Sequence, residues 1–195
     1  MPRHADALPS GCGSVAGPAG NPFRASSIAG VATIRPLTPE DAEALLELRL
    51  ANRAFLAPFD PVRPASFFTL AVQAEVARNP DGLRFAILDG RSLAGTIALS
   101  NVAYGSFRSA NVGYWVDAGR NGRGLATRAV GEVAEHAFRV IGLHRLEAGT
   151  LVDNLASQRV LEKSGFERIG LARNYLHIDG AWRDHLLFQR VDEAG

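Results

Sequence analysis

The sequence predicts an α/β fold in which helices pack on a mixed, mostly antiparallel central sheet. Two β-rich runs, residues 83–90 and 92–102, are separated by an Asp-Gly turn, which is typical of a β-hairpin. Residues 166–191 repeat this pattern around a second Asp-Gly turn. Between the two hairpins, apolar residues recur at three- and four-residue spacing over residues 125–141, which indicates an amphipathic helix. Hairpins on both sides of a long helix predict the mixed sheet.

The elements are expected in the order β-α-α-β-β-β-α-β-α-β-β. A short strand covers residues 31–37, and a helix over residues 38–55 begins with Thr38 as N-cap and Pro39 at its first position. The proline-bounded loop 58–64 leads to a second helix at about residues 66–78.

The middle of the chain supplies the remaining elements. A strand over residues 109–119 places Val112, Tyr114 and Val116 on one face, and Asn111, Gly113 and Trp115 on the other. A strand at 144–152 follows the long helix. The short helix after it, within residues 153–166, ends where Gly165 suits a left-handed position.

Length and composition favour one folded domain. The chain has 195 residues, of which 47% are hydrophobic, enough for one compact core over residues 31–192. Residues 1–28 are rich in Gly, Pro, Ser and Ala without any period, and are expected to be a disordered tail.

Charge and cysteine content exclude several classes of function. A formal net charge of +1 does not describe a protein that binds nucleic acid through bulk charge. The single cysteine, Cys12, excludes an intramolecular disulfide framework and a cysteine-rich metal site, so no metal is expected. No apolar run is long enough to span a membrane. We expect a cytoplasmic protein, a monomer or homodimer, without a membrane partner.

The stretch "DAGRNGRGLATRAV" resembles an anion-binding helix start. Backbone N–H groups of the first helical turn lack partners, and Gly122 and Gly124 have no side chain to keep a phosphate away. The P-loop is excluded, since Leu125-Ala126 stands where Lys-Ser/Thr is required. A dinucleotide-binding oxidoreductase domain stays as an alternative, because Gly122-x-Gly124 is followed about 20 residues later by Glu147.

Over residues 32–191 the sequence resembles the GNAT superfamily of acyl-CoA-dependent N-acetyltransferases, in its RimJ/RimL branch. The segments that carry the resemblance are "IRPLTPEDA", "GYWVD", "NGRGLATRAV", "DNLASQRVLEKSGF" and "ARNYLHIDGAWRDHLLF". The resemblance implies a central sheet with a splayed parallel strand pair and helices on both faces. It also implies transfer of acetyl from acetyl-CoA to a primary amine, most often a protein N-terminal α-amine of the ribosomal-protein type.

The resemblance also implies roles for particular residues. The loop would hold the pyrophosphate of acetyl-CoA, with Val116 and its neighbours pairing with the pantetheine arm and Asn154 binding that arm. The loop residues are Asn121, Gly122, Arg123, Gly124, Leu125 and Ala126. In much of the superfamily a Tyr protonates the leaving thiolate, but Val160 and Leu161 stand in its place here. The branch that the chain resembles has the same aliphatic pattern and a Ser at the Asn-x-x-Ser position, which implies this role for Ser157.

Three questions stay open at the level of sequence. Asn154 and Ser157 are also residues that any helix start prefers, so capping is an alternative to catalysis. For the general base we name Glu147, with Asp184, His185 and His177 as further candidates. We expect the segments 52–64 and 175–182 to wall the acceptor site. A non-catalytic acyl-CoA-binding sensor is the remaining alternative.

Overall fold

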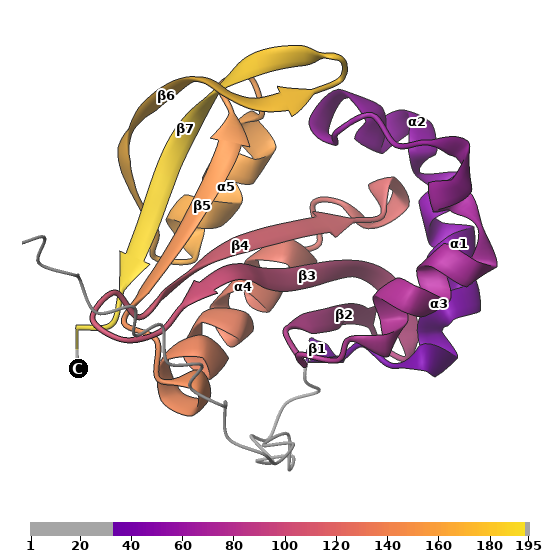
Figure 1. Ribbon diagram of the computed structural model, residues 1–195, viewed down its shortest axis with the longest axis horizontal. Coiled ribbons are helices and arrows are strands. Elements are labelled where there is room, and N and C mark those ends of the chain that lie inside the picture. The colour runs from indigo at the N-terminus through magenta and orange to yellow at the C-terminus, as the bar shows by residue number, and fades with distance from the viewer. Residues whose placement is uncertain (1–32, 194–195) are drawn as a thin grey trace, which may run out of the picture.

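One seven-stranded sheet organises the chain in the computed structural model, which describes residues 33–193 (Figure 1). The expected tail, residues 1–28, lies outside the described residues. The strand order is β1-β2-β3-β4-β5-β7-β6. The strands are β1 (Ile34–Pro36), β2 (Arg84–Asp89), β3 (Ser92–Ala103), β4 (Ser109–Val116), β5 (Arg145–Leu151), β6 (Glu167–Ile178) and β7 (Ala181–Val191).

All neighbouring strands in this sheet are antiparallel except β4 and β5. This parallel pair is short: it runs from Ser109 opposite Arg145 to Asn111 opposite Glu147. Beyond that point β4 pairs only with β3, and β5 pairs only with β7. The two strands diverge visibly in Figure 1, and the expected mixed sheet with a splayed parallel pair is confirmed.

Helices cover both faces of the sheet, as expected. The face with Val112 and Val116 packs against α4 (Leu125–His136) and belongs to the main hydrophobic core. The opposite face carries Trp115, which packs on a smaller cluster built with α1 (Ala42–Ala51) and α3 (Leu70–Arg78). The remaining helices are α2 (Arg53–Leu56) and α5 (Leu155–Lys163). The alternation predicted for the central strand is therefore confirmed.

The expected helix over residues 38–55 is divided in the structure. A 3-10 turn, Pro39–Asp41, precedes α1, and Asn52 separates α1 from α2. The buried Asn52 amide donates through Nδ2 to Leu48 O at 2.9 Å and accepts from Ala118 N–H at 2.8 Å. The Asn52 side chain bonds both its own helix and the distant segment after β4, which explains why the helix breaks at this residue. The same two bonds connect α1 to that segment.

Two other helix boundaries also differ from the expectation. The second expected helix, 66–78, is a 3-10 turn at Ala65–Phe68 followed by α3. The long helix expected over 125–141 keeps α-helical geometry only to His136 and ends in a π-helical turn, Ala137–Ile141, before Gly142. Apolar spacing of three and four residues does not distinguish these closely related turns.

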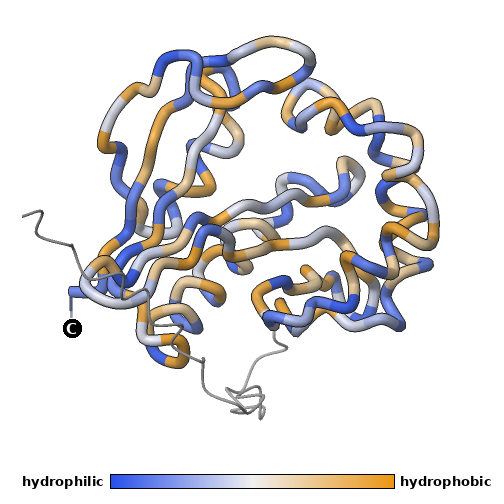
Figure 2. Tube along the Cα trace, in the orientation of Figure 1, coloured by the Kyte–Doolittle hydropathy of each residue, from blue (hydrophilic) through white to orange (hydrophobic). Residues whose placement is uncertain are grey.

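Hydrophobic and hydrophilic residues are interleaved along the elements, as Figure 2 shows. Within residues 33–193, no helix is long and apolar enough to cross a membrane.

Gly95 is required by the contact between β3 and β4. A Cβ atom built on Gly95 would lie 2.1 Å from the carbonyl oxygen of Trp115. We predict that Gly95→Ala lowers the free energy of unfolding by about 1–3 kcal/mol, because the two backbones must move apart. Denaturant unfolding measures this change.

Gly131→Ala is the matched control for this substitution. Gly131 lies in α4, and a Cβ atom there would meet nothing within 4 Å. We expect it to raise the free energy of unfolding by about 0.5–1 kcal/mol through helix propensity. Equal effects of the two substitutions would contradict the close-approach argument.

Candidate active site

A cavity of about 330 Å³ lies where β4 and β5 diverge. Residues 112–115 of β4 and 148–151 of β5 form its two sides. Asn154 and Ser157 approach from the start of α5, while Arg49, Leu56 and Asp60 approach from the α1–α2 side. The cavity exists because β4 and β5 no longer pair with each other at this position.

The cavity crosses the plane of the sheet. Tyr114 and Trp115 both line it, and successive side chains of a strand point to opposite faces. Tyr114 lies on the face covered by α4 and α5, whereas Trp115 lies on the face covered by α1 and α3. The cavity is therefore lined by side chains from both faces of the sheet.

The edge of β4 at this cavity carries free backbone groups. Asp117 N–H donates to Ala94 O at 2.8 Å, so its N–H points toward β3. Backbone groups alternate in direction along a strand, and hence Val112, Tyr114 and Val116 direct their N–H and C=O groups toward β5. The parallel pairing ends at Asn111 opposite Glu147, and this last pair uses the N–H of Val112. Among the described residues, the N–H and C=O groups of Tyr114 and Val116 therefore have no partner on β5.

Ser157 is held at the cavity by two neighbours. Its hydroxyl lies 2.9 Å from the hydroxyl of Tyr114, and the Tyr114 hydroxyl also donates to Ser157 O at 3.2 Å. Its backbone N–H donates to Asn154 Oδ1 at 3.1 Å. Asn154 is thus the N-cap of α5, as the capping alternative held, and it still lines the cavity.

The Tyr114 hydroxyl keeps its proton. Burial raises the pKa of Tyr114 to about 12, an effect that its hydrogen bond to Ser157 only partly opposes. Tyr114 therefore has one proton to donate throughout the neutral range, to Ser157 O or to the Ser157 hydroxyl. When it donates to the hydroxyl, the Ser157 proton is available to a group in the cavity.

The glycine loop presents its backbone rather than its arginines. Gly122 and Gly124 both have φ of 76°, and Gly124 immediately precedes α4. The first N–H groups of this 12-residue helix have no intrahelical partner. Arg123 instead forms an ion pair with Asp89 at 2.5 Å, and Arg120 lies 3.6 Å from the same carboxylate. Asn121 and Arg123 are exposed beside the free N–H groups, and Leu125 and Ala126 open the helix.

The four candidate bases occupy different places. Glu147 is the last residue of β5 that pairs with β4, and it is not among the cavity-lining residues. Asp184 accepts from Asn174 N–H at 2.9 Å, and His177 packs edge-on against Trp182. Only His185, on β7, lines the cavity.

His185 has a defined tautomer in this arrangement. Its Nδ1 lies 3.0 Å from the carbonyl oxygen of Arg183. A carbonyl oxygen can only accept, so the contact requires the proton on Nδ1 and leaves Nε2 with a free lone pair. Buried His185 is therefore able to accept a proton at the cavity.

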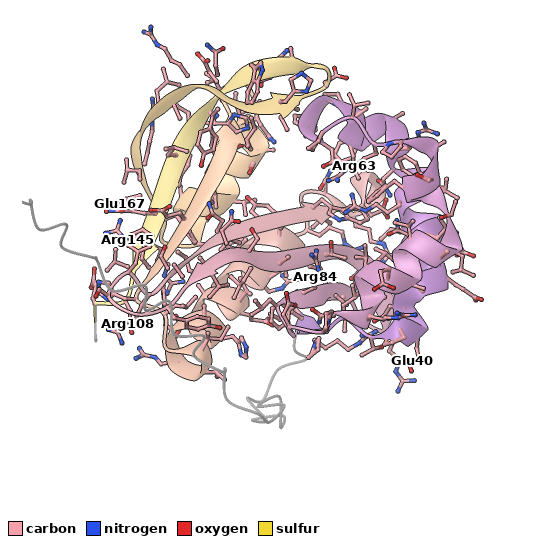
Figure 3. All side chains as sticks on the ribbon, viewed as in Figure 1. Glu40, Arg63, Arg84, Arg108, Arg145 and Glu167 are labelled. Carbon is pink, nitrogen blue, oxygen red and sulfur yellow. The ribbon has the colours of Figure 1, made fainter. Side chains whose placement is uncertain are left out.

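The two expected wall segments of the acceptor site meet. Leu56, Phe59 and Asp60 line the cavity, and Asp179 N–H at the tip of the β6–β7 hairpin reaches Asp60 O at 3.4 Å. Figure 1 shows this tip beside α2. Figure 3 shows Arg63 on this α2 side and Arg145 and Glu167 at the opposite end, where β4 and β5 still pair.

Two lining residues were not anticipated from the sequence. The sequence pattern indicates only that Tyr114 faces the core. Its contact with Ser157 joins residues 43 positions apart, which spacing along the chain does not reveal. Arg49 lies between two leucines of α1, and a charge within an apolar helix stripe was the available signal.

Comparison with known proteins agrees with this geometry. A family model described as an acetyltransferase (GNAT) domain matches residues 32–167. A probable N-acetyltransferase, YjcK of Bacillus subtilis, is 37% identical over 161 residues, covering 78% of this chain and 89% of the relative. The [ribosomal protein uS5]-alanine N-acetyltransferase of Escherichia coli is 32% identical over 163 residues, covering 79% and 84%.

Solved structures share the fold. The ribosomal-protein-S5-alanine acetyltransferase of Vibrio fischeri superposes with a TM-score of 0.78 at 30% identity, covering 83% of this chain and 93% of that one. RimJ of Mycobacterium smegmatis, solved with a CoA-disulfide, gives 0.77 at 34% identity, covering 82% and 81%. The single parallel pair in the sheet does not match a dinucleotide-binding domain, which is built on parallel strands. The chain belongs to the GNAT family of N-acetyltransferases.

Proposed function

We propose that the protein transfers acetyl from acetyl-CoA directly to a protein N-terminal α-amine. The observation that carries the proposal is the divergence of β4 from β5, which leaves an unpaired strand edge facing a cavity lined by residues from both faces of the sheet. The comparison with ribosomal-protein alanine N-acetyltransferases supports the choice of acceptor.

The residues present fit acetyl-CoA. The free N–H groups at the start of α4 suit the pyrophosphate, with Asn121, Gly122 and Gly124 around them. The free N–H and C=O groups of Tyr114 and Val116 suit the amides of an extended arm, which would pair with them as an added strand does. Buried Thr150 Oγ1 has no partner within residues 33–193 and lines the same cavity. When bound, acetyl-CoA supplies the acetyl group as a reactive thioester.

Ser157 is the proposed proton donor for the leaving thiolate. Ser157 lines the cavity, and the protonated Tyr114 hydroxyl, 2.9 Å away, fixes the position of the Ser157 hydroxyl and can donate to it. Tyr114 is a positioning residue in this scheme. Asn154 orders the same helix start through the N-cap bond and lines the cavity where it can contact the CoA arm.

His185 is the proposed proton acceptor for the incoming amine. It is the one sequence candidate that lines the cavity, and its Nε2 lone pair is free by the tautomer argument. That Glu147 acts as the base remains a prediction. It has less support than His185, because it lies where β5 still pairs with β4 and does not line the cavity.

Ligand binding and transfer test the function together. We expect acetyl-CoA and CoA to raise the unfolding midpoint while NADPH leaves it unchanged, because a ligand specific for the folded state stabilises it. Mass spectrometry of peptides incubated with acetyl-CoA should show one added acetyl group on the α-amine. Tight CoA binding without transfer to any peptide or small amine would favour the sensor alternative.

Ser157→Ala should separate catalysis from capping. Removing the hydroxyl is expected to lower kcat by about 100-fold, the effect typical of a positioned general acid. The cap bond uses the backbone N–H, so the unfolding midpoint and acetyl-CoA affinity should change little. Asn154→Ala is the complementary variant, expected to destabilise the fold by about 1 kcal/mol. Full turnover of Ser157→Ala would remove Ser157 from the mechanism.

His185→Gln and Glu147→Gln form a second matched pair. The imidazole of His185 is the proposed acceptor of the amine proton, a role that the neutral amide of Gln cannot fill. His185→Gln should lower kcat/KM by about 100-fold near neutral pH, and Glu147→Gln should leave the pH–rate profile unchanged. The reverse pattern would restore Glu147 as the base, and no effect in either variant would indicate a solvent route.

A further inference from the structure

Arg49 at the acceptor side of the cavity is an unusual group. Its side chain is only 17% exposed, and its guanidinium carbon lies 4.2 Å from the centre of the Trp115 ring. Within residues 33–193 the guanidinium makes no hydrogen bond; the nearest carboxylate oxygen, on Asp60, is 3.8 Å away. Stacking satisfies the faces of the guanidinium plane but none of its five N–H donors.

Two of the unsatisfied donors lie together. Arg49 Nε and Trp115 Nε1 are both buried without a partner, and both residues line the cavity. Burial also lowers the pKa of Arg49 to about 10, so the side chain is still charged at neutral pH. A buried, charged donor set without hydrogen bonds, whose nearest carboxylate is 3.8 Å away, is unfavourable unless a ligand supplies acceptor oxygens.

Two carboxylates, Asp60 and Asp179, lie near Arg49 together with two further arginines, Arg53 and Arg63. Asp60 is held by Arg63 through contacts of 3.2 and 3.3 Å. A second hollow of about 170 Å³ adjoins the cavity and shares Arg49 and Asp60 with it. Arg53 also lines this hollow, with its guanidinium carbon 4.5 Å from the centre of the Phe68 ring and no carboxylate partner among the described residues. Positive charge is therefore in excess where the cavity opens toward α1 and α2.

We propose that the acceptor carries a carboxylate close to its reacting amine, as an acidic side chain within the first three residues of the peptide, and that Arg49 binds it. The proposal rests on the proposed acetyl transfer and adds a substrate preference to it. Arg49 Nη groups and Nε, with Trp115 Nε1 beside them, can donate to the two carboxylate oxygens. Arg49 is thus a specificity-determining residue and takes no part in the proton transfers.

Paired peptides test this preference. Three peptides with Glu at position 1, 2 or 3 are compared with their Gln counterparts, both in kcat/KM for acetylation and in calorimetric affinity for the protein–CoA complex. At one position at least, we expect Glu to exceed Gln by about tenfold, the effect of one charge-assisted hydrogen bond. Ratios below about threefold at all positions in both measurements would overturn the proposal.

Substitutions assign the preference to a residue. Arg49→Met keeps an unbranched side chain over Trp115 and should reduce the Glu-to-Gln ratio to about one, while Arg49→Lys should keep part of it. The control is Arg78→Met, because Arg78 is 68% exposed at the end of α3 and should keep the full ratio. A Glu-to-Gln ratio that survives in Arg49→Met would overturn the role of Arg49.

Calorimetry separates the carboxylate subsite from the proposed acetyl transfer. A Glu preference in binding without acetylation would sustain the subsite and contradict acetyl transfer.

Discussion

The limited length of the β4–β5 pairing is the constraint on which the site depends. Three residue pairs join the strands, and beyond Asn111 each strand follows its antiparallel neighbour. Sheet twist separates strands that are pulled toward different partners, and the hairpin β6–β7 and the pair β2–β3 supply those partners. The free edge of β4, the cavity and the approach of α5 all follow from this divergence.

Because the cavity crosses the sheet, the two faces hold different chemistry. Tyr114 and Ser157 lie on the α4–α5 face, where the glycine loop also begins its helix. Trp115 and Arg49 lie on the face of α1 and α3. Adjacent residues of one strand thus line opposite sides of the cavity, and the strand alternation itself separates the proposed proton donor, Ser157, from the proposed acceptor subsite.

The sequence predicted local features well and distant contacts poorly. The hairpins, the helix after the glycine loop and the shared helix start of Asn154 and Ser157 depend on residues close in the chain, so turn chemistry and spacing suffice. The break at Asn52 depends on a bond to Ala118, and the environments of Arg49 and His185 depend on packing between elements far apart in sequence. No periodicity within a segment contains that information.

The two polar groups of the cavity differ in a way that bears on their roles. The Ser157–Tyr114 pair is satisfied within the protein, so it is already ordered before any substrate arrives. Among residues 33–193, Arg49 has aromatic contacts and an ion pair with Asp60 at 3.8 Å but no hydrogen bond, so its donors gain hydrogen bonds when a ligand supplies acceptors. A group that acts in the chemical step benefits from fixed geometry, since misplacement reduces its effect in the transition state. A group that selects a substrate gains discrimination from being unsatisfied, because a substrate that lacks the matching group leaves its buried donors unpaired.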